Sequence, residues 1–177
     1  LALMLLQDSR HAARCSPEGD LVLLEDQDRG LWDPQRITEG RALVERALRL
    51  GGAGFYSVQA AIAALHADAA TPAQTDWVQI TALYGVLLRL FPSPVVALNR
   101  AIAVAMAEGP EEGLRLVEEL GRGGELADYL FYHATRADLH RRLGHRDEAR
   151  AAYARALELA GNTSERRFLM RRLAECG

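Results

Sequence analysis

The sequence predicts an all-α fold in which about nine helices pack as antiparallel pairs, with one irregular connector. Composition is the first indication: 49% of the 177 residues are hydrophobic and only 6% are aromatic. Ala, Leu and Arg are abundant, and these residues lose little on entering a helix. The second indication is a pattern that occurs four times. In each copy a small or aliphatic residue is followed by an apolar residue four positions later and by further apolar residues seven to ten positions later.

The four copies of this pattern begin at Gly40, Ile80, Gly113 and Ala149. Their starts lie 40, 33 and 36 residues apart, around the period of a helix–turn–helix repeat. One such unit cannot bury its apolar face alone, so neighbouring units are expected to stack into one continuous core. The pattern therefore predicts a scaffold for binding.

Each helix is placed by its apolar spacing and by the signals at its ends. Asp33 and Pro34 form a cap and first turn, and the helix that follows is expected to stop at Gly51-Gly52. Ser93-Pro94 starts another helix in the same way. Residues 71–74 read as a capping box for the helix after them, and Asn162 begins the last one. Helices are expected over residues 1–14, 34–50, 55–67, 77–90, 94–107, 110–120, 126–143, 147–159 and 163–175.

The connector lies between the first two helices. Residues 16–20 form a turn cluster, and a short apolar run follows at residues 21–24. That run is compatible with a strand or with a buried helical turn, and periodicity does not separate the two. We favour a packed, irregular connector.

No linker divides the sequence, so a single domain over residues 1–177 is expected. The chain begins on an apolar helical pattern without Met, which indicates a fragment of a longer protein. Two cysteines, Cys15 and Cys176, are too few for a metal or disulfide framework and favour a reduced, cytoplasmic setting. No apolar run is long enough to span a membrane. A net charge of −3 gives no basis for holding a polyanion, so direct nucleic-acid binding is not expected.

The repeats resemble tetratricopeptide repeats. Residues 143–159 resemble the second half of such a repeat, with Ala149, Tyr153 and Ala156 at its packing positions. The copy from Ile80 to Pro92 is a second good match, whereas the copies at Gly40 and Gly113 are degenerate and residues 67–74 interrupt the spacing. In the first half preceding residue 143, His133 falls where the family has Trp and Ala137 matches its small residue. The resemblance implies a right-handed superhelix of stacked pairs, with the polar helix over residues 163–175 as its end cap.

A closer resemblance covers nearly the whole chain. The segments that carry it are residues 1–6, 19–29, 60–67, 76–77 and 93–101. They are similar to the C-terminal, tetratricopeptide-like extension of a class of bacterial extracytoplasmic-function sigma factors. This resemblance implies a module that acts in transcription initiation. The promoter-binding and polymerase-binding regions of that family are absent from the segment, so their residues have no counterpart here.

Seven residues are candidates for a groove that binds a partner. Asn99 and Arg100 lie among apolar residues on an inner helix of a repeat, where they would clamp a carboxylate or a peptide backbone. The alternative is that they tie neighbouring helices together by buried hydrogen bonds. By the same placement, the other candidates are Tyr56, Gln59, His133, Arg136 and His140.

Other polar clusters predict no catalytic or metal site. Residues 25–28 with Asp33 are acidic, but they lack the glycine and the distal glutamate of a calcium loop. A solvated or ion-paired loop that packs Trp32 is expected there, with docking onto another domain as an alternative. The histidines lack convergent partners for zinc, and no serine lies in a nucleophile elbow. The basic run over residues 165–172 is expected to be a solvated cap, with an acidic partner surface or promoter phosphate as alternatives.

The expected function is therefore a non-catalytic regulatory and protein-interaction module of a sigma factor, without cofactor or metal. Its expected partners are the core domains of the sigma factor, RNA polymerase or another protein. The alternative is a domain that senses a small molecule in a pocket between inner helices, near Asn99 and His133.

Overall fold

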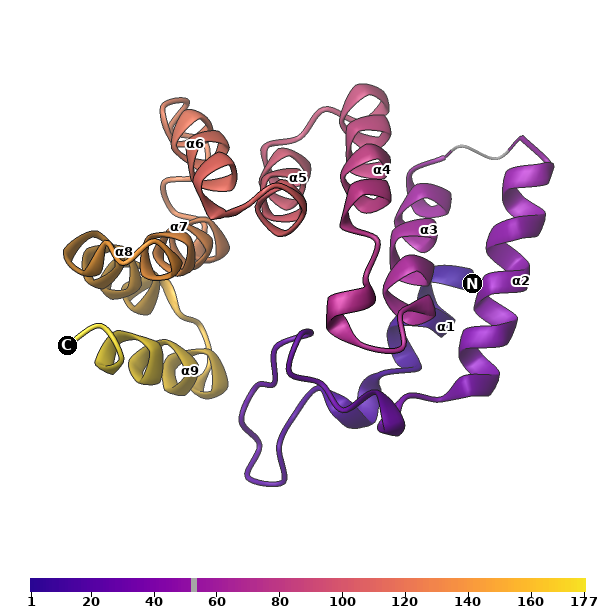
Figure 1. Ribbon diagram of the computed structural model, residues 1–177, viewed down its shortest axis with the longest axis horizontal. Coiled ribbons are helices and arrows are strands. Elements are labelled where there is room, and N and C mark those ends of the chain that lie inside the picture. Colours follow the sequence, from indigo (N-terminus) through magenta and orange to yellow (C-terminus); the bar gives the residue numbers. More distant parts are fainter. Residues whose placement is uncertain (52–53) are drawn as a thin grey trace. The chain divides into compact units, whose positions relative to one another are not determined.

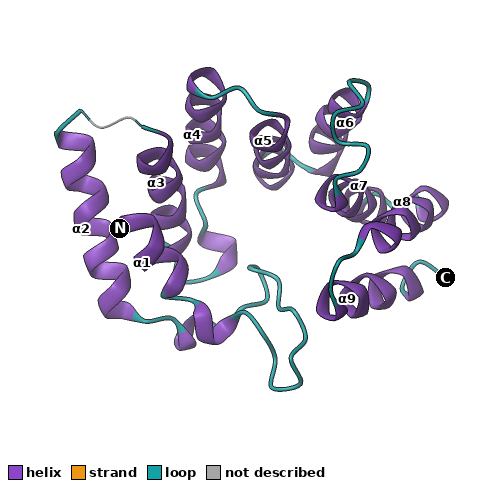
Figure 2. Cartoon of the chain, turned by 180° about the vertical axis from the view of Figure 1, so that it is seen from behind, coloured by secondary structure: helices purple, strands orange, loops and turns teal. Residues whose placement is uncertain are grey.

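The computed structural model describes residues 1–51 and 54–177, so the predicted stop at Gly52 lies outside the described residues. The described chain is all-α, with nine α-helices packed in consecutive antiparallel pairs and without a strand, as expected (Figure 2). It divides into an N-terminal unit, Leu1–Phe91, and a C-terminal unit, Pro92–Gly177. Each unit is described by itself, and the single domain over residues 1–177 stays a prediction.

The described residues of the N-terminal unit form four α-helices and three short 3₁₀ turns (Figure 1). Helices α1, α2 and α3 pack against one another, and α4 packs against α3. The core between them is built mainly of small residues, with Leu6 from α1 and Val44 from α2 packed on three alanines of α3. The helices are α1 (Ala2–Asp8), α2 (Pro34–Arg49), α3 (Phe55–Asp68) and α4 (Trp77–Leu90), and the turns are His11–Ala13, Arg29–Leu31 and Pro72–Gln74.

The first helix is shorter than predicted, because the expected helix over residues 1–14 ends at Asp8. The Ser9 hydroxyl donates to the Leu6 carbonyl oxygen at 2.8 Å, and the Ser9 carbonyl oxygen accepts from the Asp33 N–H at 2.8 Å. A carbonyl used by the start of α2 does not serve a further turn of α1. Asp8 also pairs with Arg36 of α2. Contacts between α1 and α2, which are distant in sequence, therefore override the local helical pattern.

The segment between α1 and α2 is an irregular connector, as expected. A single bridge joins Cys15 and Leu21, the Ser16 N–H donates to the Asp20 carbonyl oxygen at 2.8 Å, and the Val22 N–H donates to the Arg14 carbonyl oxygen at 2.9 Å. The apolar run over residues 21–24 thus forms neither a regular strand nor a helix.

Of four predicted helix starts, two have the expected side-chain cap and two do not. The Asp33 carboxylate accepts from the N–H groups of Gln35 and Arg36, as expected for the cap of α2. The capping box at residues 71–74 is wrong, because the Thr71 side chain caps nothing and the residues after it form a 3₁₀ turn. The cap of α4 is Asp76, whose carboxylate accepts from the Gln79 N–H at 2.9 Å. Ser93 stands before α5 without a side-chain cap bond, whereas the Asn162 side chain caps α9 through the Glu165 N–H.

The C-terminal unit consists of two helix pairs and a final helix. Helix α5 pairs with α6, α7 pairs with α8, and α9 packs on α8. The predicted helix over residues 126–143 begins four residues late, because residues 121–129 form successive turns that include Gly124 at φ +73°. The helices are α5 (Pro94–Ala107), α6 (Pro110–Gly121), α7 (Leu130–Arg142), α8 (Arg146–Leu159) and α9 (Thr163–Ala174).

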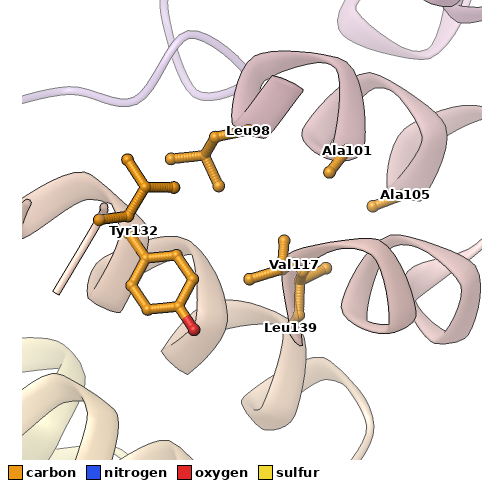
Figure 3. Packing of buried hydrophobic residues seen from close by; sticks show 7 residues of the cluster. Leu98, Ala101, Ala105, Val117, Tyr132 and Leu139 are labelled. Atoms are coloured by element: carbon orange, nitrogen blue, oxygen red, sulfur yellow. The ribbon is translucent and has the colours of Figure 1, made fainter. Parts of the chain in front are cut away.

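Two apolar clusters hold this unit together. The first joins Leu98, Ala101 and Ala105 of α5 to Val117 of α6 and to Tyr132 and Leu139 of α7 (Figure 3). The second surrounds Tyr153 of α8 and includes Ala137 of α7 and Leu169 of α9. Burial of these side chains supplies the main stabilising free energy of the unit.

Gly113 on α6 permits the close approach of α5. A Cβ atom at this position would lie 2.3 Å from the Ala105 Cβ and 2.9 Å from the Ala105 Cα. We expect Gly113→Ala to lower the free energy of unfolding by about 1–2 kcal/mol, since overpacking outweighs the better helix propensity of Ala. Urea unfolding followed by circular dichroism checks this. Gly161→Ala is the control, because no atom lies within 4 Å of its added Cβ; equal effects at both positions would contradict the prediction.

Candidate functional site

The seven candidate groove residues are divided between the two units. Tyr56 and Gln59 lie on α3 in the N-terminal unit, whereas the other five lie on α5 and α7 in the C-terminal unit. Tyr56 is 74% exposed and its ring meets the edge of Phe55, which in turn meets Phe91. Gln59 is half-buried and forms no hydrogen bond with any described residue. Tyr56 therefore belongs to a group of aromatic rings at the start of α3 and just after α4.

Asn99 and Arg100 are both half-buried on α5. Neither side chain forms a hydrogen bond or an ion pair within the part of the chain that the structure describes. Buried hydrogen bonds between helices, the structural alternative for this pair, are thus not formed by these side chains. Their donors and acceptors remain available to a ligand.

The His133 side chain forms a hydrogen bond to the turn that precedes its own helix, α7. Its Nε2 lies 2.8 Å from the Ala127 carbonyl oxygen, so Nε2–H donates to the turn that precedes α7. The ring also meets the edge of Tyr132 at a centroid distance of 5.0 Å. His133 therefore fixes the entry into α7, and it does not join the other α7 candidates.

Arg136 and His140 meet at Glu118 of α6. Arg136 Nε lies 2.6 Å from Glu118 Oε1, and His140 Nε2 lies 3.4 Å from the same oxygen. His140 Nδ1 lies 3.2 Å from His145 Nδ1 at the start of α8. We call these four residues the Glu118 cluster. The Glu118 oxygen joins α6 to α7, and the contact between His140 and His145 extends the cluster to the residue before α8.

The contacts assign proton positions in the Glu118 cluster. The carboxylate beside His140 Nε2 favours a proton there, although the 3.4 Å contact is too long and too poorly aligned for a strong hydrogen bond. His140 Nδ1 is then an acceptor, and His145 Nδ1–H is its donor. His145 is thus linked to His140 by a hydrogen bond, and His140 is linked to Glu118 by a longer electrostatic contact.

Burial sets the charges in the cluster. His140 is 7% exposed, and burial lowers its pKa, with the Arg136 charge acting in the same direction and Glu118 opposing it. Burial raises the pKa of Glu118, but the hydrogen bond and the charge of Arg136 outweigh it, so the net direction is down. At neutral pH the cluster therefore holds an ionised Glu118–Arg136 pair beside a neutral His140.

Sequence reasoning missed Glu118 and the role of His145. Glu118 sits next to Glu119 in a charged helix, and nothing in the local pattern distinguishes the two. Only the packing of α6 against α7 brings Glu118 to Arg136.

No group of three histidine, cysteine or acidic side chains that could hold a metal ion occurs among residues 1–51 and 54–177. None of the helices in these ranges is long and apolar enough to cross a membrane.

Glu118→Gln tests the electrostatics of the cluster. The carboxylate raises the pKa of His140, so its loss is expected to move that pKa further below the ordinary value. NMR titration of the His140 ring protons measures the shift. Glu119→Gln is the matched control, since Glu119 pairs with Arg115 instead. An unchanged or raised His140 pKa in Glu118→Gln would show that the Glu118 carboxylate does not raise the pKa of His140.

Comparison with known proteins gives one match over nearly the whole chain and one over its N-terminal residues. The chain is 52% identical over 172 residues to an uncharacterized protein of Rhizobium meliloti (strain 1021), a match that covers 97% of this chain and 40% of that protein. No solved structure matches. Residues 1–48, which include α1, the connector and most of α2, match the model of a family of unknown function, DUF6596.

Proposed function

We propose that the chain is a non-catalytic interaction module of a bacterial sigma factor, which modulates transcription initiation by packing on the sigma core or by holding a protein partner. The supporting observation is an apolar residue exposed near the start of two successive helix pairs. Val95, the second residue of α5, is 36% exposed, and Phe131, the second residue of α7, is 53% exposed. Exposed apolar side chains on helices serve as anchors where a helix or an extended peptide binds.

The assignment to a sigma factor draws on the resemblance of residues 19–29, 60–67 and 93–101 to the C-terminal extension of those proteins. In the structure these segments are the connector, the second half of α3 and the first half of α5. The relative from Rhizobium meliloti extends well beyond the matched segment. Promoter-binding domains elsewhere in a longer protein are consistent with that extra length.

Regulation by such a module is a shift between two arrangements of the whole protein. A partner alters transcription only if it binds one arrangement more tightly than the other. A tenfold difference in affinity corresponds to about 1.4 kcal/mol, which one buried aromatic side chain readily supplies. Phe131 is the residue from which we expect the largest contribution.

Deletion in the full-length protein tests the proposal. Removal of residues 1–177 is expected to change the yield of run-off transcription with core RNA polymerase by about tenfold or more, because the biasing contact is lost. Transcription and partner binding that are both unchanged would refute a regulatory role.

A point variant then tests the surface. In the full-length protein, Phe131→Ser is expected to reproduce much of the effect of the deletion, because it removes the exposed ring and leaves the cores intact. Ala154→Ser is the matched control, since Ala154 is exposed on α8. Equal behaviour of the two variants in transcription would show that the partner does not contact Phe131.

A further inference from the structure

Three arginines gather where α1 ends, in the N-terminal unit. The side chains of Arg10 and Arg14 point to one acceptor: Arg10 donates to Gln7 Oε1 at 2.6 Å, and Arg14 donates to the same oxygen at 3.0 Å. Arg14 also donates to the Gln7 carbonyl oxygen at 2.7 Å. Two positive guanidinium groups therefore converge on a single neutral amide.

Arg29 extends this positive region from the connector. Its guanidinium lies 4.6 Å from the centre of the Trp32 ring and donates to the carbonyl oxygens of His66 and Ala69 at the end of α3. The charges of Arg14 and Arg29 both lower the pKa of Arg10, after burial, which is the largest cause. Arg14 and Arg29 are thus each near enough to Arg10 to repel its charge.

No carboxylate of the described chain lies within ion-pair distance of these arginines. Within residues 1–51 and 54–177, neither Arg10, Arg14 nor Arg29 forms an ion pair with a carboxylate. The unit holds acidic residues, but Asp8 and Asp33 pair with Arg36, and Asp68 pairs with Arg41. A cluster of like charges without a counter-charge costs stability, and perturbed charged groups cluster at functional sites.

Unused donors surround the arginines. Trp32 is only 7% exposed, yet its indole N–H has no hydrogen-bond partner within the described chain. The Nε of Arg29 is likewise buried without a partner. Arg10 and Arg14 use only Gln7 as an acceptor, so most of the five donors on each guanidinium are uncommitted. The region therefore has both excess positive charge and spare N–H groups.

We propose that Arg10 and Arg14, backed by Arg29, form a binding site for a phosphate group. Two adjacent guanidinium groups can bind the same phosphate, each by parallel N–H···O bonds. A phosphate carries more negative charge than a carboxylate, so it neutralises several arginines more completely. The bound oxygens replace the Gln7 amide as acceptor. This site lies on the N-terminal unit, whereas Val95 and Phe131 lie on the C-terminal unit.

Titration with inorganic phosphate tests the site in the full chain. The arginine Nε–H resonances of Arg10 and Arg14 are followed by NMR, with chloride at equal ionic strength as the reference. Saturable shifts at these two residues are expected. A parallel titration with glycerol 3-phosphate identifies the source: tighter binding of the monoester indicates an organic phosphate, and tighter binding of the inorganic ion indicates free phosphate. Saturable binding of neither would overturn the proposal.

Variants separate ligand binding from a structural role. Arg10→Gln with Arg14→Gln is expected to weaken phosphate binding by about tenfold or more, since both guanidinium groups are lost. In phosphate-free buffer the same variant is expected to be at least as stable as the wild type, because it removes repulsion. Arg46→Gln is the matched control, as Arg46 is exposed on α2. Unchanged phosphate affinity in the double variant would overturn the proposal.

A third variant predicts a change of the opposite sign. Gln7→Ala removes the internal acceptor that competes with phosphate for Arg10 and Arg14, so it is expected to tighten phosphate binding. A purely structural arginine cluster predicts no such gain. Weaker binding by Gln7→Ala would show that phosphate does not take the place of the Gln7 amide, and would overturn the proposed geometry.

Discussion

Tyr153→Ala is expected to lower the free energy of unfolding by about 3–5 kcal/mol, the largest single effect in the C-terminal unit. Tyr153 is 1% exposed, and four of the six other buried residues of its cluster are alanines: Ala137, Ala149, Ala152 and Ala156. Alanines have no side-chain freedom with which to fill the space of a lost ring. The cavity therefore stays open, and the gain in helix propensity offsets only a small part of the cost. Urea unfolding followed by circular dichroism measures the loss.

Tyr153→Phe is the control for the loss of the ring. Burial raises the pKa of the Tyr153 hydroxyl to about 12, and the carboxylate of Asp138 acts in the same direction. Removal of the hydroxyl alone is expected to cost about 1 kcal/mol, the net contribution of one hydrogen bond. If the two variants were equally destabilised, the hydroxyl and not the ring would be the important group.

The second large effect is a loss of stability in acid that arises from His66. Burial, assisted by the charges of Arg10 and Arg29, lowers the pKa of His66 to about 4. In the unfolded chain this histidine titrates near 6.5, so the unfolded state binds more protons between these values and stability falls as the pH falls. This loss of stability is absent above pH 6.5. It reaches about 3 kcal/mol once the pH is below the pKa of His66 in the folded protein.

His66→Phe measures this contribution directly. The ring of His66 meets the edge of Trp77 at 5.1 Å, and phenylalanine keeps that contact while it removes the titrating group. The free energy of unfolding is compared between pH 8 and pH 4.5 for both proteins. The variant is expected to lose about 2–3 kcal/mol less than the wild type. Parallel pH profiles would show that His66 is protonated alike in the folded and unfolded states.

Most of the fold was predictable from the sequence because its helix signals are local. Asp33-Pro34 and Asn162 begin helices at the residues where their caps act, and Ser93-Pro94 marks the start of α5. The predicted helix ends were wrong where tertiary contacts or competing turns determine where a helix begins or ends. Ser9 ends α1 because its carbonyl oxygen binds Asp33, which lies in another part of the sequence. Asp76 displaces Thr71 as the cap of α4, because residues 72–74 close their own turn.

The candidate site was less predictable, because charged residues acquire meaning only from their partners. Arg136 and His140 were singled out by their position in a repeat, but Glu118, which joins them, comes from the preceding helix. The arginine site was also missed, although Gln7, Arg10 and Arg14 lie close in sequence. What distinguishes this site is that no carboxylate pairs with its arginines, and a sequence alone does not show which charges remain unpaired.

The hydrogen bond between Ser9 and Asp33 has a consequence for how this protein tolerates changes in length. It joins the two ends of the connector, and the Asp8–Arg36 pair lies beside it. When the ends of a loop are held together, each doubling of the length between them adds only about 0.6 kcal/mol of closure entropy. Residues inserted at the turn over positions 16–20 would therefore lengthen an anchored loop and leave the packing of α1 on α2 in place.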